Sequence, residues 1–376
     1  MMWNAESPEA AAVSLDLERK LKATASDWAQ VLKGPGFGVW VAERSTCFGA
    51  HLLCDDAGVV VGEAFARVKD LQSDAPAYDA KFNRMETLEA LRTQGRSLAA
   101  KFWGNFVAFI VDRVQGNGGR GARYVFKDPS GTLPCYFTEQ QGVQVVFSSL
   151  EDCRRIGFSF RVNWEFVRSR AVNSFLDTEI PTLLGVSTVH RGECVAFDDR
   201  GKAISQSLYW HPSSFEGASD LVVDSAAAAK FMRATVRSCV HSMAGHHLSV
   251  LAQTSGGLDS SIVLGCLGDA PHKPKITCYT AYLKDSVCDE RRWARHASQR
   301  GGYRHIEVCR GPRDLVFRDL PALAPSVEPA SFFPIGSGGL WTEKWPRSIG
   351  PPRRSPEKAE TLRFARPPTV TLPITA

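Results

Sequence analysis

The chain has 376 residues, of which 44% are hydrophobic and 10% aromatic, a length and composition that suit two packed domains. Its formal net charge is +5, but residues 337–376 hold seven Lys or Arg against three Asp or Glu, so the rest is nearly neutral and gives no footprint for nucleic acid. No apolar run approaches the roughly 20 residues that cross a bilayer, and residues 1–20 lack the order of a signal peptide, so we expect a cytoplasmic protein without a membrane partner.

Cysteine usage fits a reducing compartment. The chain has ten cysteines, none of them in a Cys-x-x-Cys pair, and most stand within apolar runs. This pattern favours reduced, buried thiols over a zinc site or a disulfide framework.

The first half of the chain is predicted to be rich in β-strands. Short β-branched and aromatic runs are separated by Gly, Pro, Asp and Asn, which is typical of stacked antiparallel sheets. These runs cover residues 37–44, 58–67, 105–113, 122–128, 134–140 and 143–149. Between the second and third, residues 84–102 have helical apolar spacing at Leu88, Leu91, Leu98 and Phe102. We expect one helix there, covering a face of a sheet.

Residues 164–212 are predicted to begin as a helix and to end as two strands joined by a turn at Asp199-Arg200-Gly201. The polar stretch 211–220, which contains Gly and Ser, has the composition of a linker. We therefore place a first domain at residues 1–214.

The second half alternates between helices and strands, with Asp224 or Ser225 as a possible cap of the first helix. The helices are expected at 222–245, 259–269 and 289–300, and the strands at 248–254, 275–283 and 303–310. This alternation predicts a parallel sheet with right-handed crossovers in a second domain at residues 215–336.

Residues 337–376 differ in composition from everything before them. They hold seven of the 21 prolines, interleaved with basic residues and without a sustained period. We predict a Pro/Arg-rich tail that is disordered or extended.

The most informative stretch is LAQTSGGLDSSIVLGCLGD, residues 251–269, which places a Ser/Gly-rich turn between a buried strand and a helix. In an open parallel sheet, ligands bind in the crevice at the carboxyl ends of the strands. Gly256 and Gly257 have no side chains, so anion oxygens can approach the backbone N–H groups there. Ser255, Ser260 and Ser261 add hydroxyl groups. The helix that follows directs its positive N-terminal end to the same point. The turn therefore predicts a phosphate or pyrophosphate site.

The negative carboxylate of Asp259 would repel a phosphate unless a cation lies between the two groups. Mg²⁺ prefers a carboxylate together with phosphate oxygens and water, so Asp259 is a candidate metal ligand. The alternative is an ordinary first-turn acid that interacts with the helix dipole. No Gly-Lys-Ser/Thr follows, which excludes the P-loop. His296 and His305 have no partners at metal-ligand spacing and are interpreted as structural residues.

The loop SGGLDSS, residues 255–261, resembles the pyrophosphate loop of the N-type ATP pyrophosphatases and is similar to that of the asparagine synthetases, whose relatives include β-lactam synthetases and lasso-peptide macrocyclases. Residues 103–112, 126–137 and 145–153 resemble, in order, three further segments of the asparagine synthetase family. The resemblance spans roughly residues 35–335.

The resemblance implies an α+β domain followed by an α/β domain: an amidotransferase-like antiparallel β-sandwich with helices, then a parallel-sheet nucleotide-binding domain of the adenine nucleotide α-hydrolase type. The second domain would use ATP and Mg²⁺ to adenylate a carboxylate, which an amine attacks with release of AMP and pyrophosphate. Backbone atoms near Thr254 and Thr280 would contact adenine, and no side chain is assigned a catalytic role. The implied ATP and pyrophosphate ligands are Ser255, Gly256, Gly257, Asp259, Ser260 and Ser261.

The chain departs from the family pattern at two places. Glutamine-hydrolysing members use an N-terminal cysteine, whereas this chain begins Met1-Met2-Trp3, so we expect an inactive glutaminase-like domain. Such a domain is typical of the macrocyclase branch, which implies a precursor peptide and its protease as partners. The family's later Ser-Gly-x-Gly-x-Asp-Glu segment is also missing after Ser337-Gly338-Gly339, and we expect a second domain truncated at its C-terminus.

Three functions stay open at this point. The first is an ATP-dependent amide-forming ligase, most like a peptide macrocyclase. The second is a glutamine-hydrolysing asparagine synthetase whose start is misassigned. The third is a non-catalytic remnant or binding module.

Overall fold

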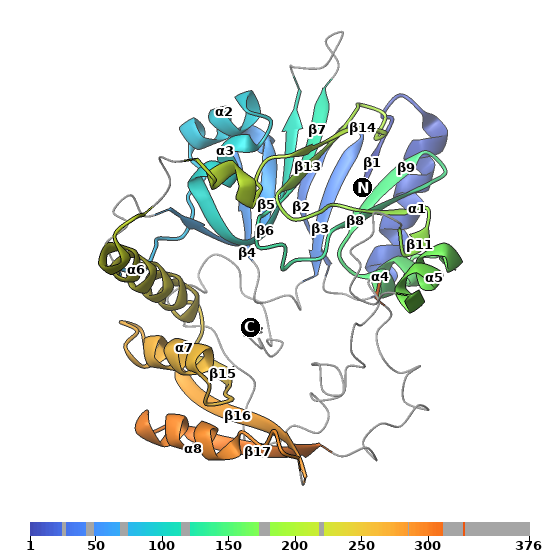
Figure 1. The fold of residues 1–376 in the computed structure, drawn as a ribbon. Coiled ribbons are helices and arrows are strands. Elements are labelled where there is room, and N and C mark those ends of the chain that lie inside the picture. The colour runs from blue at the N-terminus through green and yellow to red at the C-terminus, as the bar shows by residue number, and fades with distance from the viewer. Residues whose placement is uncertain are drawn as a thin grey trace. The chain divides into compact units, whose positions relative to one another are not determined.

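The computed structural model describes residues 1–24, 28–42, 49–67, 74–113, 121–172, 181–217, 222–284, 286–310 and 326–327. The chain forms two compact units, of mixed α/β structure, with antiparallel sheets in unit 1 and a parallel sheet in unit 2 (Figure 1). Unit 1 comprises Met1–Arg67, Asp79–Asp220 and Pro325–Ser331, and unit 2 comprises Val68–Tyr78, Leu221–Ala324 and Phe332–Ala376. The predicted tail at 337–376 lies outside the described residues.

Unit 1 contains two six-stranded antiparallel sheets. The first has the order β12-β8-β9-β1-β3-β2, built from Val186–Thr188, Tyr136–Gln140, Val143–Phe147, Met2–Trp3, Phe37–Ala42 and Trp28–Gly34. The second has the order β14-β13-β7-β6-β5-β4, built from Ala203–Leu208, Glu193–Phe197, Ala122–Lys127, Phe102–Asp112, Gly58–Ala66 and Gly49–Leu52. Each of the six strand runs predicted in this half overlaps one of these strands.

The two sheets pack face to face, and helices cover their outer faces (Figure 1). One apolar cluster takes side chains from both sheets and forms the middle of the sandwich; it includes Phe37, Val59, Val125, Val195 and Phe197. On the outer face of the first sheet lie α1 (Pro8–Thr24) and α4 (Leu150–Arg155), and on that of the second sheet lie α2 (Arg84–Arg92) and α3 (Arg96–Lys101). Alternating strand side chains therefore supply three apolar layers.

The single helix predicted at 84–102 is two helices. Gly95 has φ +90 and precedes α3, so the chain turns between α2 and α3 instead of continuing one helix. Phe102 already belongs to β6. Leu98 is 1% exposed and lies in the core, whereas Leu88, which the spacing placed on the same apolar face, is 53% exposed.

Helix α1 and strand β2 were not predicted. The buried positions of α1, Ala10, Ser14, Leu17 and Leu21, follow helical spacing but include small and polar residues, which weakens the periodic signal. The hydroxyl of Ser7 accepts a hydrogen bond from the N–H of Ala10 at 3.2 Å, a cap that the sequence does show.

The remaining elements of unit 1 lie between its main strands. Helix α5 (Trp164–Val172) matches the helix predicted at the start of 164–212, and β10 (Arg161–Val162) pairs with β11 (Leu183–Leu184). Two short 3₁₀ helices, η1 (Cys54–Asp56) and η2 (Pro212–Phe215), complete the described elements. The helix η2 lies within the stretch expected to be a linker, so Pro212–Phe215 are helical where the composition predicts a loop.

Unit 2 has the order α6 (Ser225–Ala244), β15 (Ser249–Gln253), α7 (Leu258–Gly268), β16 (Lys275–Leu283), α8 (Arg291–Arg300), β17 (Arg304–Arg310). The strands form a parallel sheet in the order β15-β16-β17, as predicted. The carboxylate of Asp224 accepts from the N–H of Ala226 at 3.0 Å, so Asp224 is the cap of α6. Helix α8 begins two residues after the predicted start at 289. Within the described ranges, no helix combines the length and apolar character that crossing a bilayer requires.

The two leucines of the split helix provide a matched test of the packing. Leu98→Ala should lower the free energy of unfolding by about 2–5 kcal/mol, because it removes a buried side chain and leaves a cavity. Leu88→Ala should change it by no more than about 0.5 kcal/mol, because the side chain is exposed. Urea denaturation followed by tryptophan fluorescence measures both values, and equal effects would contradict this assignment of the core.

Candidate functional site

The Ser/Gly-rich loop lies between β15 and α7, at the carboxyl end of the first parallel strand. The hydroxyl of Ser255 accepts a hydrogen bond from the N–H of Gly257 at 3.1 Å and lies 3.1 Å from the hydroxyl of Ser260. Ser260 is buried, and its hydroxyl also donates to the carbonyl of Gly257 at 3.3 Å. These two hydroxyls therefore hold the loop against α7, and their predicted contacts with phosphate stay a prediction. Ser261 is half-buried, and its N–H donates to the carbonyl of Gly257 at 3.1 Å.

The two glycines of the loop have different neighbours. Gly256 has φ +81, and a β-carbon there would lie 2.3 Å from the carbonyl carbon of Trp293 and 2.5 Å from the nitrogen of Ala294, both in the backbone of α8. Gly257 has φ −70, and the one described atom that its β-carbon would meet is the Ser255 hydroxyl oxygen, at 3.2 Å. Gly256 thus allows α8 to pack against the loop, whereas Gly257 keeps the outer surface of the loop open.

The start of α7 offers an anion-binding surface. Gly257 is the N-cap residue and has no side chain with which to cap the helix, and in the described part of the chain no other side chain is placed as its cap. The first N–H groups of a helix have no partner within the helix, and they carry partial positive charge. Since Leu258 and Asp259 are both exposed, an anion can reach this helix end from solvent.

Asp259 lies in the first turn of α7, with its carboxylate exposed to solvent. Its carboxylate forms no hydrogen bond or ion pair with another described residue, and the described ranges contain no group of three His, Cys, Asp or Glu residues that could hold a metal ion by themselves. A single carboxylate fits Mg²⁺, which commonly takes one or two carboxylates and completes its coordination with phosphate oxygens and water. Asp259 therefore fits a Mg²⁺ ion that binds together with a polyphosphate.

Thr254 and Thr280, the predicted adenine neighbours, lie next to each other, Thr254 directly after β15 and Thr280 in β16. The N–H of Thr254 donates to the carbonyl of Tyr279 at 2.9 Å, and the carbonyl of Thr254 accepts from the hydroxyl of Thr280. Both threonines are buried. Because the N–H of Thr254 is already bonded, an adenine contact here requires other backbone groups; this contact stays a prediction.

The charged side chains around α8 are paired with one another. The carboxylate of Asp289 accepts from the Arg291 guanidinium at 2.6–2.9 Å, which lowers the pKa of Asp289 to about 2, and Arg295 donates to Glu307. The Arg291 guanidinium also lies 3.5 Å from the ring centroid of Tyr282. Arg291 and Arg295 therefore each have an acidic partner, which offsets their positive charge.

The buried cysteines agree with the reduced-thiol prediction. Cys135, Cys153 and Cys194 are buried in unit 1, Cys266 and Cys278 are buried in unit 2, and none of these five is in a disulfide. Burial raises the pKa of Cys135, Cys153 and Cys194 to about 12. These thiols are neutral at physiological pH and therefore poor nucleophiles.

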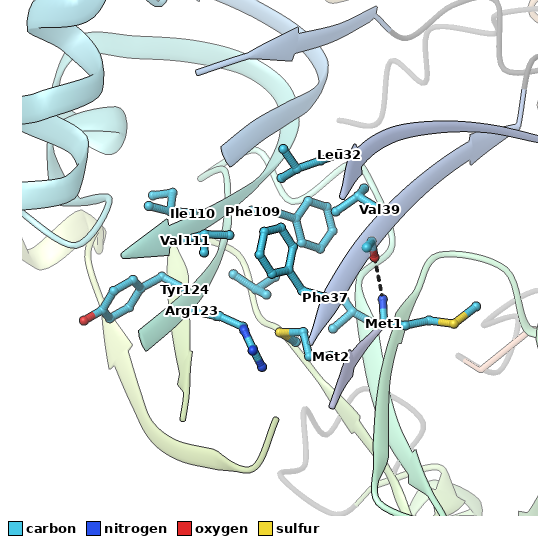
Figure 2. A pocket seen from close by; sticks show the side chains of 13 residues that line it. Met1, Met2, Leu32, Phe37, Val39, Phe109, Ile110, Val111, Arg123 and Tyr124 are labelled. Carbon is cyan, nitrogen blue, oxygen red and sulfur yellow. Dashed lines mark hydrogen bonds between the residues drawn. The ribbon is translucent and has the colours of Figure 1, made fainter. Parts of the chain in front are cut away.

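Unit 1 contains a small apolar cavity between its sheets (Figure 2). Its walls include Phe37, Phe109 and Val125, together with Met1, whose amine donates to the carbonyl of Gly38 at 2.8 Å. Arg123 also lines it, with its pKa lowered by burial. The volume of about 20 Å³ holds roughly one water molecule and is too small for an amino acid.

Comparisons with known proteins support part of this assignment. Residues 232–333 match the family model described as asparagine synthase, and that range includes the whole Ser/Gly loop. No curated protein matches the chain. One solved structure that resembles it, glutamine-dependent NAD+ synthetase from Acinetobacter baumannii in complex with adenosine diphosphate, is 12% identical over 59% of this chain and 53% of that chain, with a TM-score of 0.21. The chain spans about half the length of that relative.

The two glycines predict opposite outcomes for the same substitution. Gly256→Ala should destabilise the packing of α8 on the loop by about 1–3 kcal/mol or more, because alanine is strained at this φ and its β-carbon collides with backbone. Gly257→Ala should keep the fold. Hydrogen exchange of the peptide that covers residues 291–300 measures the difference, and equal protection in the two variants would contradict the assigned packing.

Thiol labelling tests the burial of the unit 1 cysteines. At pH 8.5 the exposed Cys288 should react with iodoacetamide in the folded protein, whereas Cys135 should react only after denaturation, because its pKa is about 12. A raised thiol pKa contributes stability that is present below the unfolded value of 9.0 and is lost as the pH rises towards 12. Mass spectrometry of the labelled peptides reads out both sites, and fast labelling of folded Cys135 would refute its burial.

Proposed function

We propose that unit 2 binds ATP at the loop of residues 255–261 and that the protein is an ATP-dependent ligase that forms amide bonds. The observation that carries this proposal is the open start of α7: a helix end without a side-chain cap, at the carboxyl end of a parallel strand, inside the region that matches the asparagine synthase family. In this type of sheet, that position is where nucleotides bind.

The loop suits the pyrophosphate part of ATP. The N–H groups at the start of α7 and the positive end of its dipole favour negatively charged oxygens, and the bare Gly257 permits their close approach. Ser255 and Ser260 contribute indirectly, because their hydroxyls hold the loop in the conformation that presents these N–H groups. Preorganised donors of this kind favour a reaction in which negative charge grows on a departing pyrophosphate.

Asp259 would hold Mg²⁺ against the phosphate oxygens. When bound, ATP and Mg²⁺ supply the activation of a carboxylate for attack by an amine, with AMP and pyrophosphate as products. The residues of the chain bind the phosphates, position the cation through Asp259 and keep the loop folded. None of the described side chains is assigned a proton-transfer role.

We further propose that the amine comes from the substrate, as in the macrocyclisation of a peptide. One observation in unit 1 supports a source other than glutamine hydrolysis. Burial keeps the thiols of Cys135, Cys153 and Cys194 neutral, and neutral thiols are poor nucleophiles. On this proposal, the substrate is a peptide with a free N-terminus and an acidic side chain, released from a precursor by a protease.

A second candidate function is a nucleotide-binding module without catalysis. It is favoured by the isolation of Asp259, which has no second carboxylate in a metal-binding group across the described ranges. The two functions differ in a direct assay. The ligase releases pyrophosphate from MgATP when a peptide with an acidic side chain is added, and it yields a product lighter than the peptide by one water; the module binds MgATP and releases none.

Asp259→Asn should remove the advantage that Mg²⁺ gives to ATP binding. In the unchanged protein, MgATP should bind at least about tenfold more tightly than ATP in EDTA, because the cation lies between Asp259 and the phosphates. In the variant the two affinities should converge, and metal-free ATP should bind as well as before or slightly better, because a like charge is gone. Isothermal titration calorimetry measures the four dissociation constants.

The matched control is Asp269→Asn, which removes a carboxylate at the other end of α7, where it pairs with Arg237 at 2.8 Å. This variant should keep the full difference between MgATP and metal-free ATP. If Asp259→Asn kept it too, Asp259 would not be the metal ligand. If the unchanged protein bound neither form of ATP, the proposed function itself would be wrong.

A further inference from the structure

A line of hydrogen bonds crosses the parallel sheet next to the candidate nucleotide site. The carbonyl of Thr254, directly before the Ser/Gly loop, accepts from the hydroxyl of Thr280 in β16. The same hydroxyl oxygen lies 2.9 Å from Nε2 of His305 in β17. Since Cys278 is the register partner of His305 and Thr280 is two residues further along β16, the two side chains lie on the same face of the sheet.

The chemistry of the threonine hydroxyl determines the direction of these bonds. A hydroxyl has one proton, and Thr280 gives it to the carbonyl of Thr254. It can therefore only accept from His305, which requires a proton on Nε2. The structure thus selects one tautomer of His305, in which Nδ1 carries the lone pair when the ring is neutral.

Burial makes this line of bonds expensive to break. Thr254 is 1% and Thr280 4% exposed, and the side chain of His305 is 11% exposed. Without the histidine, the hydroxyl of Thr280 would lose its donor in a place that water reaches poorly, and it could turn away from Thr254. Hydrogen bonds that run from one side chain to the next also strengthen one another.

The charged groups near His305 leave the Nε2 proton in place. Nδ1 lies 3.9 Å from the carboxylate of Glu307, which is itself bonded to Arg295. Burial lowers the pKa of His305, Glu307 opposes this shift and Arg295 adds to it. Protonation of the ring adds a proton to Nδ1 and keeps the one on Nε2, so both charge states hold the same bond to Thr280.

We propose that His305 is a positioning residue for the nucleotide. Through its bond to Thr280, it holds the carbonyl of Thr254, the residue directly before the loop, in the orientation that ATP binding requires. This inference rests on the proposed function of the loop. His305 does not touch the loop, and its spacing in the sequence indicates no metal-ligand partner.

The first test needs no nucleotide. In protein labelled with ¹⁵N histidine, NMR at pH 8 should show His305 as the Nε2–H tautomer, identified by the loss of its signals in a His305→Gln variant. Nδ1–H as the main tautomer would overturn the inference, whatever the protein binds.

The second test compares MgATP affinities by calorimetry. His305→Leu should weaken MgATP binding about five- to tenfold, the effect of roughly one hydrogen bond. His305→Gln should restore the affinity to within about twofold, because its amide nitrogen can donate near the position of Nε2. The matched control is His296→Leu, the same exchange at an exposed position of α8 that makes no bond to Thr280, which should bind like the unchanged protein.

Two variants of Thr280 test whether the effect of His305 on the carbonyl of Thr254 passes through the Thr280 hydroxyl. Thr280→Val should weaken MgATP binding as much as His305→Leu, the double variant should be no weaker than either, and Thr280→Ser should keep the affinity because it keeps the hydroxyl. Unchanged MgATP affinity in His305→Leu, in a protein whose parent binds MgATP, would overturn the inference and leave the proposed function standing. A glutamine variant as weak as the leucine variant would overturn it as well, since the donated bond would not matter. A parent protein that does not bind MgATP would overturn both.

Discussion

The contact on which the candidate site depends is the approach of Gly256 to the backbone of α8. A β-carbon at this residue would lie within 2.3–2.5 Å of the backbone at Trp293 and Ala294, so the absence of a side chain is what lets the loop and α8 pack together. That contact turns the loop towards α7, where the Ser255 and Ser260 hydroxyls complete its conformation. Directly after Gly256 come the bare Gly257, the helix start without a side-chain cap and the exposed Asp259.

Polar side chains in unit 2 act mainly on one another. Arg291 is occupied by Asp289, Arg295 by Glu307, and the Thr280 hydroxyl by its bonds to Thr254 and His305. Ion pairs and bonded hydroxyls of this kind stabilise a fixed geometry, and the positive end of the α7 dipole attracts an anion. The site is therefore built from backbone, with side chains that hold the backbone in place.

Unit 1 has the character of a packed scaffold in its described part. Its sandwich contains three apolar layers, and the buried thiols of Cys135, Cys153 and Cys194 are neutral. Neutral thiols are poor nucleophiles. This is consistent with the proposal that the chemistry resides in unit 2 and that the amine is part of the substrate.

The sequence by itself determined the order of strands and helices in unit 2, most strands of unit 1, and the loop at residues 255–261, because these follow from short-range periodicity and from a motif whose residues are adjacent in the chain. Only the tertiary structure showed that Gly256 and Gly257 have different roles and that Leu98 is buried whereas Leu88 is exposed. It also showed helix α1 and the contact between His305 and Thr280. Each of these depends on contacts between residues far apart in the chain: the spacing that places a residue on a helix or strand says nothing about which backbone or side chain packs against it.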